Sequence, residues 1–62
     1  MPEQLLTLPQ VAERLQVPLK TLYAMRSKQT APRGIRVGRH IRVRESDLDA
    51  WLEAHADDRH AA

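Results

Sequence analysis

The chain has 62 residues, no cysteine and a formal net charge of +2. A chain this short forms one domain with a small core, and without cysteine neither disulfides nor a thiolate-bound zinc can stabilise it. The sequence contains no stretch with the pattern of a signal peptide or a membrane span. We therefore expect a cytoplasmic protein without a membrane partner.

The charges are distributed unevenly along the chain. Residues 20–44 contain eight basic residues and no acidic one, whereas residues 1–19 sum to −1 and residues 45–62 to −5. A polyanion would be attracted by the middle block and repelled by the last one, as expected for a nucleic-acid-binding protein. Charge alone does not separate this interpretation from an ordinary solvated basic surface.

A first helix is predicted from about Leu8 to about Gln16. Thr7 and Gln10 have the spacing of a capping box, and Pro9 stands in the first turn, where a missing N–H is harmless. The inward stripe is formed by Leu8, Val11, Ala12 and Leu15. The preceding Leu5-Leu6 pair is too short to predict as a strand and is expected to be at most a short extended segment.

A second helix is predicted from about Leu19 to Lys28, because Val17-Pro18 ends the first one. Leu22 and Met25 are expected to point inward, with Val17 from the turn beside them. Two short helices joined by a tight turn, with the small Ala12 where they cross, form a helix-turn-helix layout.

Residues 29–34 are predicted to be a loop, after which the hydrophobic period changes to two. Aliphatic and basic residues then alternate, which predicts a hairpin with one aliphatic and one basic face. The aliphatic set is Ile35, Val37, Ile41 and Val43, and the basic set is Arg36, Arg42 and Arg44. A three-residue turn, Gly38-Arg39-His40, would pair Val37 with Ile41 and Ile35 with Val43, whereas a two-residue Gly38-Arg39 turn would put Arg36 opposite Ile41. The alternation favours the three-residue turn or a bulge.

A third helix is predicted from Ser46, acting as its cap, through Ala54. Its inward residues are Leu48, Trp51 and Leu52, and a frayed polar tail is expected from about His55 onward. The elements together predict a mainly α fold with a small β-hairpin, a winged helix-turn-helix of three helices plus a wing. We expect this domain over residues 1–55 and the flexible tail over residues 56–62.

The second helix is the candidate reader of double-stranded DNA, because a major groove about 12 Å wide admits a helix. Residues sharing the face expected to meet base edges are Lys20, Tyr23, Ala24 and Ser27. Residues expected to flank that face at the height of the phosphates are Thr21, Arg26 and Lys28. For Tyr23, partial burial with the hydroxyl in water is an equal alternative.

The hairpin is the candidate wing. Its predicted DNA contacts are Arg33, Arg36, Arg39, His40 and Arg42, and Arg39 is expected to enter a narrow minor groove. A metal or pH-sensing role for His40 is disfavoured because no ligand cluster accompanies it, so no metal or cofactor is expected. Trp51 is interpreted as a core anchor rather than a base-stacking residue. No catalytic arrangement is evident, so we expect no enzyme.

The segments LLTLPQVAERLQVPLKTLYAMR (5–26) and IRVGRHIRVRESDLDAWLEAH (35–55) resemble the excisionase-type winged helix-turn-helix proteins, small relatives of the MerR-type DNA-binding domain. The resemblance implies a recombination directionality factor of a phage or mobile element, which bends DNA beside an attachment site and directs an integrase toward excision. Its DNA contacts would fall on Lys20, Thr21, Tyr23 and Arg26 and on Arg36, Arg39, His40 and Arg42. The family often has glycine where this chain has Gln16, and serine or threonine where it has Pro18.

Three hypotheses therefore stand. The first is an excisionase that acts architecturally in several copies, with an integrase as partner and possible cooperative self-association on DNA. The second is a small transcriptional regulator with the same fold. The third is a protein-interaction module whose basic block meets an acidic partner; it is disfavoured because that block coincides with the elements that would read the grooves.

Overall fold

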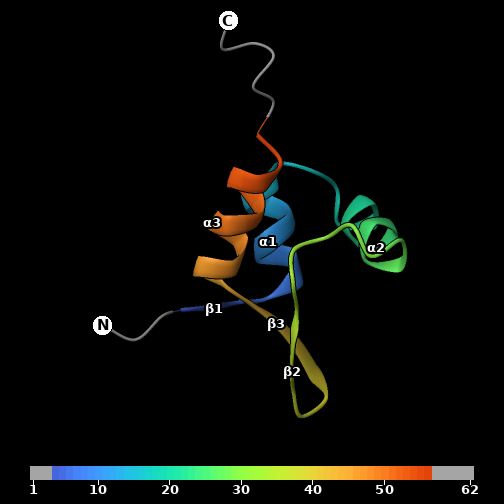
Figure 1. Ribbon diagram of the computed structural model, residues 1–62. Coiled ribbons are helices and arrows are strands. Elements are labelled where there is room, and N and C mark those ends of the chain that lie inside the picture. Colours follow the sequence, from blue (N-terminus) through green and yellow to red (C-terminus); the bar gives the residue numbers. More distant parts are fainter. Residues whose placement is uncertain (1–3, 57–62) are drawn as a thin grey trace, which may run out of the picture.

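The computed structural model describes residues 4–56 as three helices and three short strands. The elements in chain order are β1 (Leu5–Leu6), α1 (Leu8–Leu15), α2 (Leu19–Ser27), β2 (Ile35–Val37), β3 (His40–Arg44) and α3 (Glu45–Ala54). Helix α1 lies between α2 and α3, and the β2–β3 hairpin projects away from the helices (Figure 1). This is a winged helix-turn-helix fold, as the sequence predicts.

Helix α1 begins with the predicted capping box. The Thr7 hydroxyl accepts a hydrogen bond from the Gln10 backbone N–H at 3.2 Å, and the Gln10 side chain accepts one from the Thr7 backbone N–H at 2.9 Å. Two N–H groups at the start of the helix are thereby satisfied without help from any other element. Val11 and Ala12 are buried, which confirms the predicted inward face.

The turn between α1 and α2 requires one left-handed residue. Gln16 has a φ of 58°, its N–H donates to the Glu13 carbonyl, and the Val17 N–H donates to the Ala12 carbonyl, both at 3.1 Å. These two bonds form a Schellman motif, in which glycine is the usual left-handed residue because it has no Cβ. Helix α2 follows from Pro18, with no side-chain hydrogen bond at its cap.

The hydrophobic core draws on every element except β2. Its buried residues are Leu6 from β1, Val11 and Ala12 from α1, Leu22 from α2, Val43 from β3 and Leu48 from α3. Ala12 is 4% exposed, which agrees with the prediction that a small residue stands where α1 and α2 approach each other. The core therefore joins both halves of the helix-turn-helix to the sheet and to α3.

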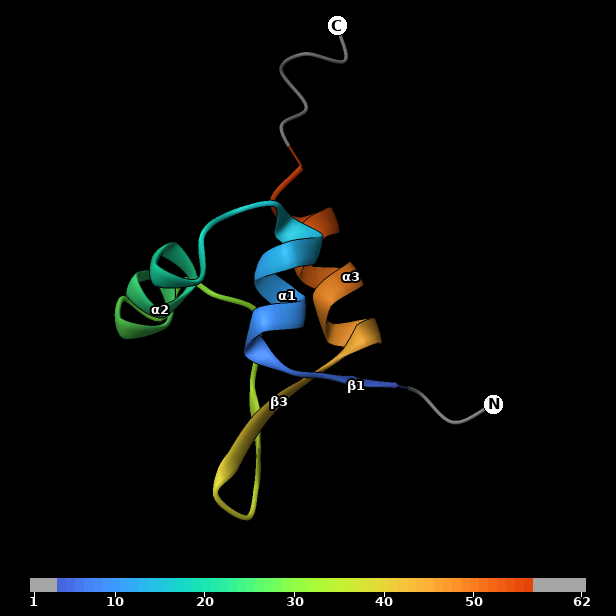
Figure 2. The same ribbon diagram turned by 180° about the vertical axis from the view of Figure 1, so that it is seen from behind.

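Strand β1 is short but well placed. It pairs antiparallel with β3, with Leu6 opposite Val43, and the sheet order is β1-β3-β2. The carbonyl of Gln4 accepts a hydrogen bond from the Glu45 N–H at 3.2 Å. Figure 2 shows β1 crossing β3 beneath α1 and α3, so this segment closes the lower side of the core. Two leucines were too few to predict this strand from the sequence.

The predicted hairpin register is wrong. The strands are joined by a two-residue turn, Gly38-Arg39, which places Val37 opposite His40, Arg36 opposite Ile41 and Ile35 opposite Arg42. Gly38 has a positive φ of 61° and Arg39 does not, which is the φ pattern of a type II′ hairpin turn.

The shift in register follows from the position of β2 at the edge of the sheet. Paired residues share a face, so Arg36 lies on the face of Ile41, whereas Ile35 lies on the face of Arg42. Val37 is 46% exposed and does not join an aliphatic face. Alternation determines register only where a core covers one face, and β2 contributes no residue to the core.

Helix α3 starts earlier than predicted. Its N-cap is Arg44 without a side-chain cap bond, so Ser46 lies inside the first turn and is not the cap. Strand β3 continues directly into α3, and the Gln4 carbonyl accepts a hydrogen bond from the Glu45 backbone N–H. Leu52 is 44% exposed rather than inward, because α3 packs along a narrow stripe through Leu48. The local sequence predicts Ser46 as the N-cap, but the junction with β3 and the hydrogen bond to Gln4 place the start of the helix earlier.

Helix α3 ends at Ala54, as predicted. His55 caps the helix, and its ring stacks on Trp51 with centroids 4.2 Å apart. Trp51 is half-buried and lies outside the core, so it is not the core anchor that the sequence predicts. Residues 57–62 of the predicted tail lie outside the described residues.

Candidate nucleic-acid interface

The predicted reading helix presents most of its candidate residues to solvent. The exposed ones are Lys20, Thr21, Tyr23, Ala24, Ser27 and Lys28. Tyr23 is 52% exposed, so its ring is partly covered and partly free. Leu22 is the one buried residue of α2 and attaches the helix to the core. Helix α2 is thus held through Leu22 and the partly buried Leu19, and its exposed residues are open to a ligand.

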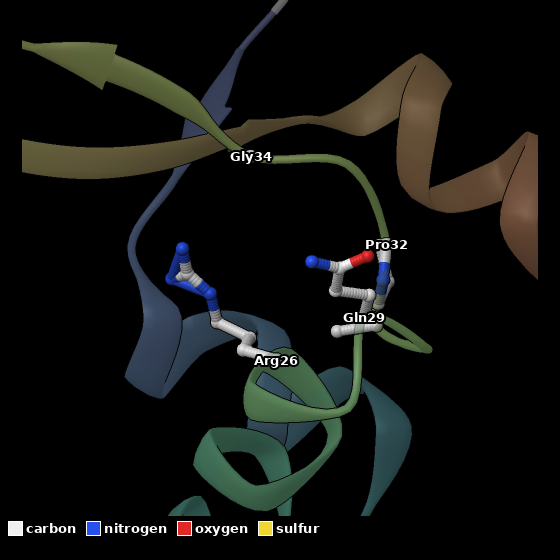
Figure 3. Close-up of a pocket in the computed structure, with 5 residues that line it drawn as sticks. Arg26, Gln29, Pro32 and Gly34 are labelled. Atoms are coloured by element: carbon white, nitrogen blue, oxygen red, sulfur yellow. The ribbon is translucent and has the colours of Figure 1, made fainter.

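Arg26 is placed differently from the other α2 candidates. Its side chain is half-buried and lines a hollow of about 230 Å³ with Gln29, Ala31, Pro32 and Gly34. In Figure 3 the Arg26 guanidinium and the Gln29 amide extend into the same space between the end of α2 and the chain entering β2. Gln29 was not among the predicted site residues, because nothing in the local sequence marks a glutamine in a loop as functional.

The wing candidates are divided between the two faces and the tip of the hairpin. Arg33, Arg36, Arg39 and His40 are exposed, and Arg39 occupies the second position of the turn, at the far end of the wing. Arg42 is half-buried, and its guanidinium donates to the Ile41 carbonyl at 2.9 Å. Because Arg36 and Arg42 lie on opposite faces, one groove wall cannot meet both in the same way.

A second hollow lies beside the wing. It has a volume of about 430 Å³ and is lined by Arg33, Gly34, Ile35, Arg36, Arg44 and Asp47. Arg44 was not a predicted site residue. Asp47 comes from the first turn of α3 and places one carboxylate among three arginines. Direct phosphate contact is therefore less favoured here than at the wing tip.

Basic and acidic residues lie mostly on different elements of the fold, with Asp47 beside the wing as an exception. The basic run of residues 20–44 spans α2 and the wing, whereas Glu45, Asp47, Asp49 and Glu53 lie on α3. Helix α1 separates α3 from α2 (Figure 1). The uneven charge along the sequence thus becomes an uneven charge in space, with α2 and the wing attractive to a polyanion.

Trp51 ties the loop between α2 and the wing to α3. Its indole N–H donates to the Thr30 carbonyl at 3.0 Å, and Thr30 in turn binds the end of α2 through its N–H and hydroxyl to the Met25 carbonyl. The loop from residue 28 to residue 34 is therefore held at one end by α2 and in its middle by α3. This arrangement sets where the wing begins relative to the reading helix.

Over residues 4–56 no group of three His, Cys, Asp or Glu side chains lies together as metal ligands would. In the same range, none of the helices is both long and apolar enough to cross a bilayer.

A family model described as helix-turn-helix domain matches residues 5–56. The chain belongs to this helix-turn-helix family. The match covers every described helix and strand, and family membership implies DNA binding with double-stranded DNA as the partner. No curated protein and no solved structure matched the chain.

Proposed function

We propose that this helix-turn-helix protein is an excisionase that binds and bends attachment-site DNA, performs no chemistry itself and directs an integrase toward excision. Two exposed basic elements carry the proposal: α2 presents a free face, and a hairpin with Arg39 at its tip projects from the same small body. A helix suits the major groove, and an arginine-tipped wing suits a narrow minor groove.

Occupying two grooves from one compact domain favours bending. The reading helix and the wing are joined through a loop that is bonded to both α2 and α3, so their separation changes little on binding. Because the two elements are rigidly spaced, both contact the DNA only if the duplex bends to fit them. The free energy of the added contacts then offsets the energy of bending the DNA. The sequence resemblance to excisionases and the inclusion of excisionase-like domains in the family support this role.

The first test is an electrophoretic mobility-shift titration on the DNA flanking the gene, with any neighbouring attachment site as a separate fragment. We expect a ladder of specific, increasingly bent complexes at the attachment site, and a circular-permutation assay measures the bend. Specific binding only at a promoter would instead support a transcriptional regulator. Absence of binding to any duplex, together with capture of an acidic protein, would support the protein-interaction hypothesis.

Salt dependence tests the DNA contact itself. If each protomer neutralises about five phosphates, the logarithm of affinity should fall with the logarithm of salt concentration with a slope of about −4.5. A slope near zero would contradict a backbone-contacting interface.

Single substitutions test the proposed division of roles between α2 and the wing. Arg39→Ala should weaken binding to every duplex, because contacts in a narrow groove and to phosphates carry little sequence information. Lys20→Ala and Tyr23→Ala should instead change the preference among related sites. Equal effects of all three on all duplexes would refute this division. Arg14→Ala, on the α1 surface that faces α3, serves as the control for loss of charge.

A further inference from the structure

Arg26 has an unusual environment for an arginine. Its side chain is half-buried, yet it makes no hydrogen bond or ion pair with any residue from 4 to 56. Buried charges in proteins are normally paired, because removing a charge from water is costly. Among the described residues, no fully buried side-chain nitrogen or oxygen lacks a hydrogen-bond partner, so the unpartnered Arg26 guanidinium remains reachable from solvent. The stem is held in place while the charged head faces the hollow.

Gln29 faces the same hollow and is held there by the end of α2. The Gln29 N–H donates to the Arg26 carbonyl at 3.0 Å, and the Thr30 N–H donates to the Met25 carbonyl at 2.9 Å. These bonds form a second Schellman motif, with Gln29 at its left-handed position, φ 61°. Glycine avoids the cost of about 1–2 kcal/mol that a side chain incurs in this conformation. The chain has glutamine there instead, and its amide extends over the hollow (Figure 3).

Gly34 lines the opposite side of the hollow and has no side chain that would fill it. A Cβ added at this position would lie 3.1 Å from Ile41 Cγ2 and 3.9 Å from an Arg26 guanidinium nitrogen. A side chain here would press on the wing and take space beside the cation. The residues that line the hollow include no carboxylate, so an incoming anion meets no competing negative charge there.

The hollow lies between the end of α2 and the start of β2, the two elements proposed to enter adjacent grooves. Between the major and minor grooves of a duplex runs one sugar–phosphate strand. We propose that this hollow seats a single DNA backbone phosphate, with the Arg26 guanidinium and the Gln29 side-chain amide as its two donors. Gln29 is thereby assigned a direct DNA contact, and the inference rests on the proposed DNA binding.

A phosphate matches the chemistry of the two donors. Guanidinium presents a planar fork of N–H groups that binds phosphate oxygens in pairs, and the amide nitrogen adds a neutral donor from a second direction. One phosphate held in this way would set the register of both groove-reading elements, because it lies where they meet. It would carry no sequence information itself.

The test measures binding to a mixed-sequence duplex as a function of salt for two variants and two matched controls. Arg26→Gln should lower affinity about tenfold, and it should make the salt slope less steep by about 0.9, as expected for one lost phosphate contact. Gln29→Gly should lower affinity about tenfold with an unchanged slope, because the amide carries no charge. The control for Arg26→Gln is Arg14→Gln, which removes the same charge. The control for Gln29→Gly is Gln16→Gly, which removes a side chain from a left-handed backbone position, φ 58°.

The controls distinguish a binding role from a structural one. Both glycine variants should be at least as stable as the parent chain, since each removes a left-handed side chain, but only the Gln29 variant should lose affinity. If Arg26→Gln and Gln29→Gly bind as their controls do, the phosphate seat is overturned while DNA binding by the protein stands. If the parent chain binds no duplex at all, the proposed function itself fails.

NMR separates a DNA phosphate from a free anion. The side-chain N–H signals of Arg26 and Gln29, assigned by their loss in the variants, should shift together when the duplex is added. Inorganic phosphate alone should shift them only weakly, because it lacks the contacts on either side. Saturable shifts with inorganic phosphate and none with the duplex would overturn the assignment in favour of a free anion.

Discussion

The two helices of the helix-turn-helix are stabilised in different ways. Helix α1 has a capping box at its start, and two of its eight residues are buried. Helix α2 has no side-chain cap bond, and one of its nine residues, Leu22, is buried. Helix α1 is therefore specified by its own sequence and by the core, whereas α2 depends on being attached to α1. Of these two helices, the one that would read DNA has the less local support.

The largest expected effect comes from removing the attachment of α2. Leu22→Ala should lower the free energy of unfolding by about 2–5 kcal/mol, as is typical of a buried leucine. Circular dichroism during urea unfolding measures the loss, and a variant already unfolded without urea also meets the expectation. Tyr23→Ala, on the exposed side, should change stability by only about 0.5 kcal/mol. A loss below about 1 kcal/mol for Leu22→Ala would mean that α2 is self-supporting.

A smaller effect is expected at the start of α1. Thr7→Ala removes the hydroxyl that accepts the Gln10 N–H and should cost about 0.5–2 kcal/mol. Thr7→Ser retains the cap and is the matched control. Thermal unfolding measures both variants, and duplex affinity under conditions where they remain folded should not change. Equal stabilities of the alanine and serine variants would show that α1 does not need its capping box.

The tie between α3 and the loop after α2 should contribute slightly less. Trp51→Phe removes the bond to the Thr30 carbonyl but retains an aromatic ring, and should cost about 0.5–1.5 kcal/mol. It should also weaken duplex binding without altering the salt slope, because the wing is positioned less firmly. His55→Ala removes the ring stacking but leaves the indole bond in place, so it should leave duplex binding nearly unchanged. Unchanged affinity in the phenylalanine variant would argue against a positioning role.

The smallest effect is expected on the face of α1 that meets α3. Arg14 and Glu45 form an ion pair at 3.1 Å on a largely exposed surface. A double-mutant cycle with Arg14→Gln and Glu45→Gln should give a coupling energy of about 0.2–1 kcal/mol that declines with added salt. Coupling that persists at high salt would indicate that the ion pair is shielded from solvent and contributes more to the packing of α1 against α3.

Local patterns anticipated the elements well but not their partners. The Thr7 to Gln10 spacing and the Val17-Pro18 break located α1 and α2 within a residue or two, because caps and helix ends are local chemistry. The hairpin register failed because apolar alternation in β2 has no core opposite it, and the Gly38 turn decided the pairing instead. The candidate site was predicted as a set of exposed basic residues, and the contribution of Gln29 was missed.

The sequence by itself determined which segments are helical, where the loop and the wing lie, and that the positive charge is concentrated between residues 20 and 44. These properties depend on neighbours within a few positions along the chain. The tertiary structure decided the pairing of β1, the start of α3 and the meeting of Arg26 with Gln29 beside the wing. Each of these three features depends on contacts with segments that are distant along the chain. The hydrophobic period and the residue spacing within one segment do not specify which distant segment it will contact.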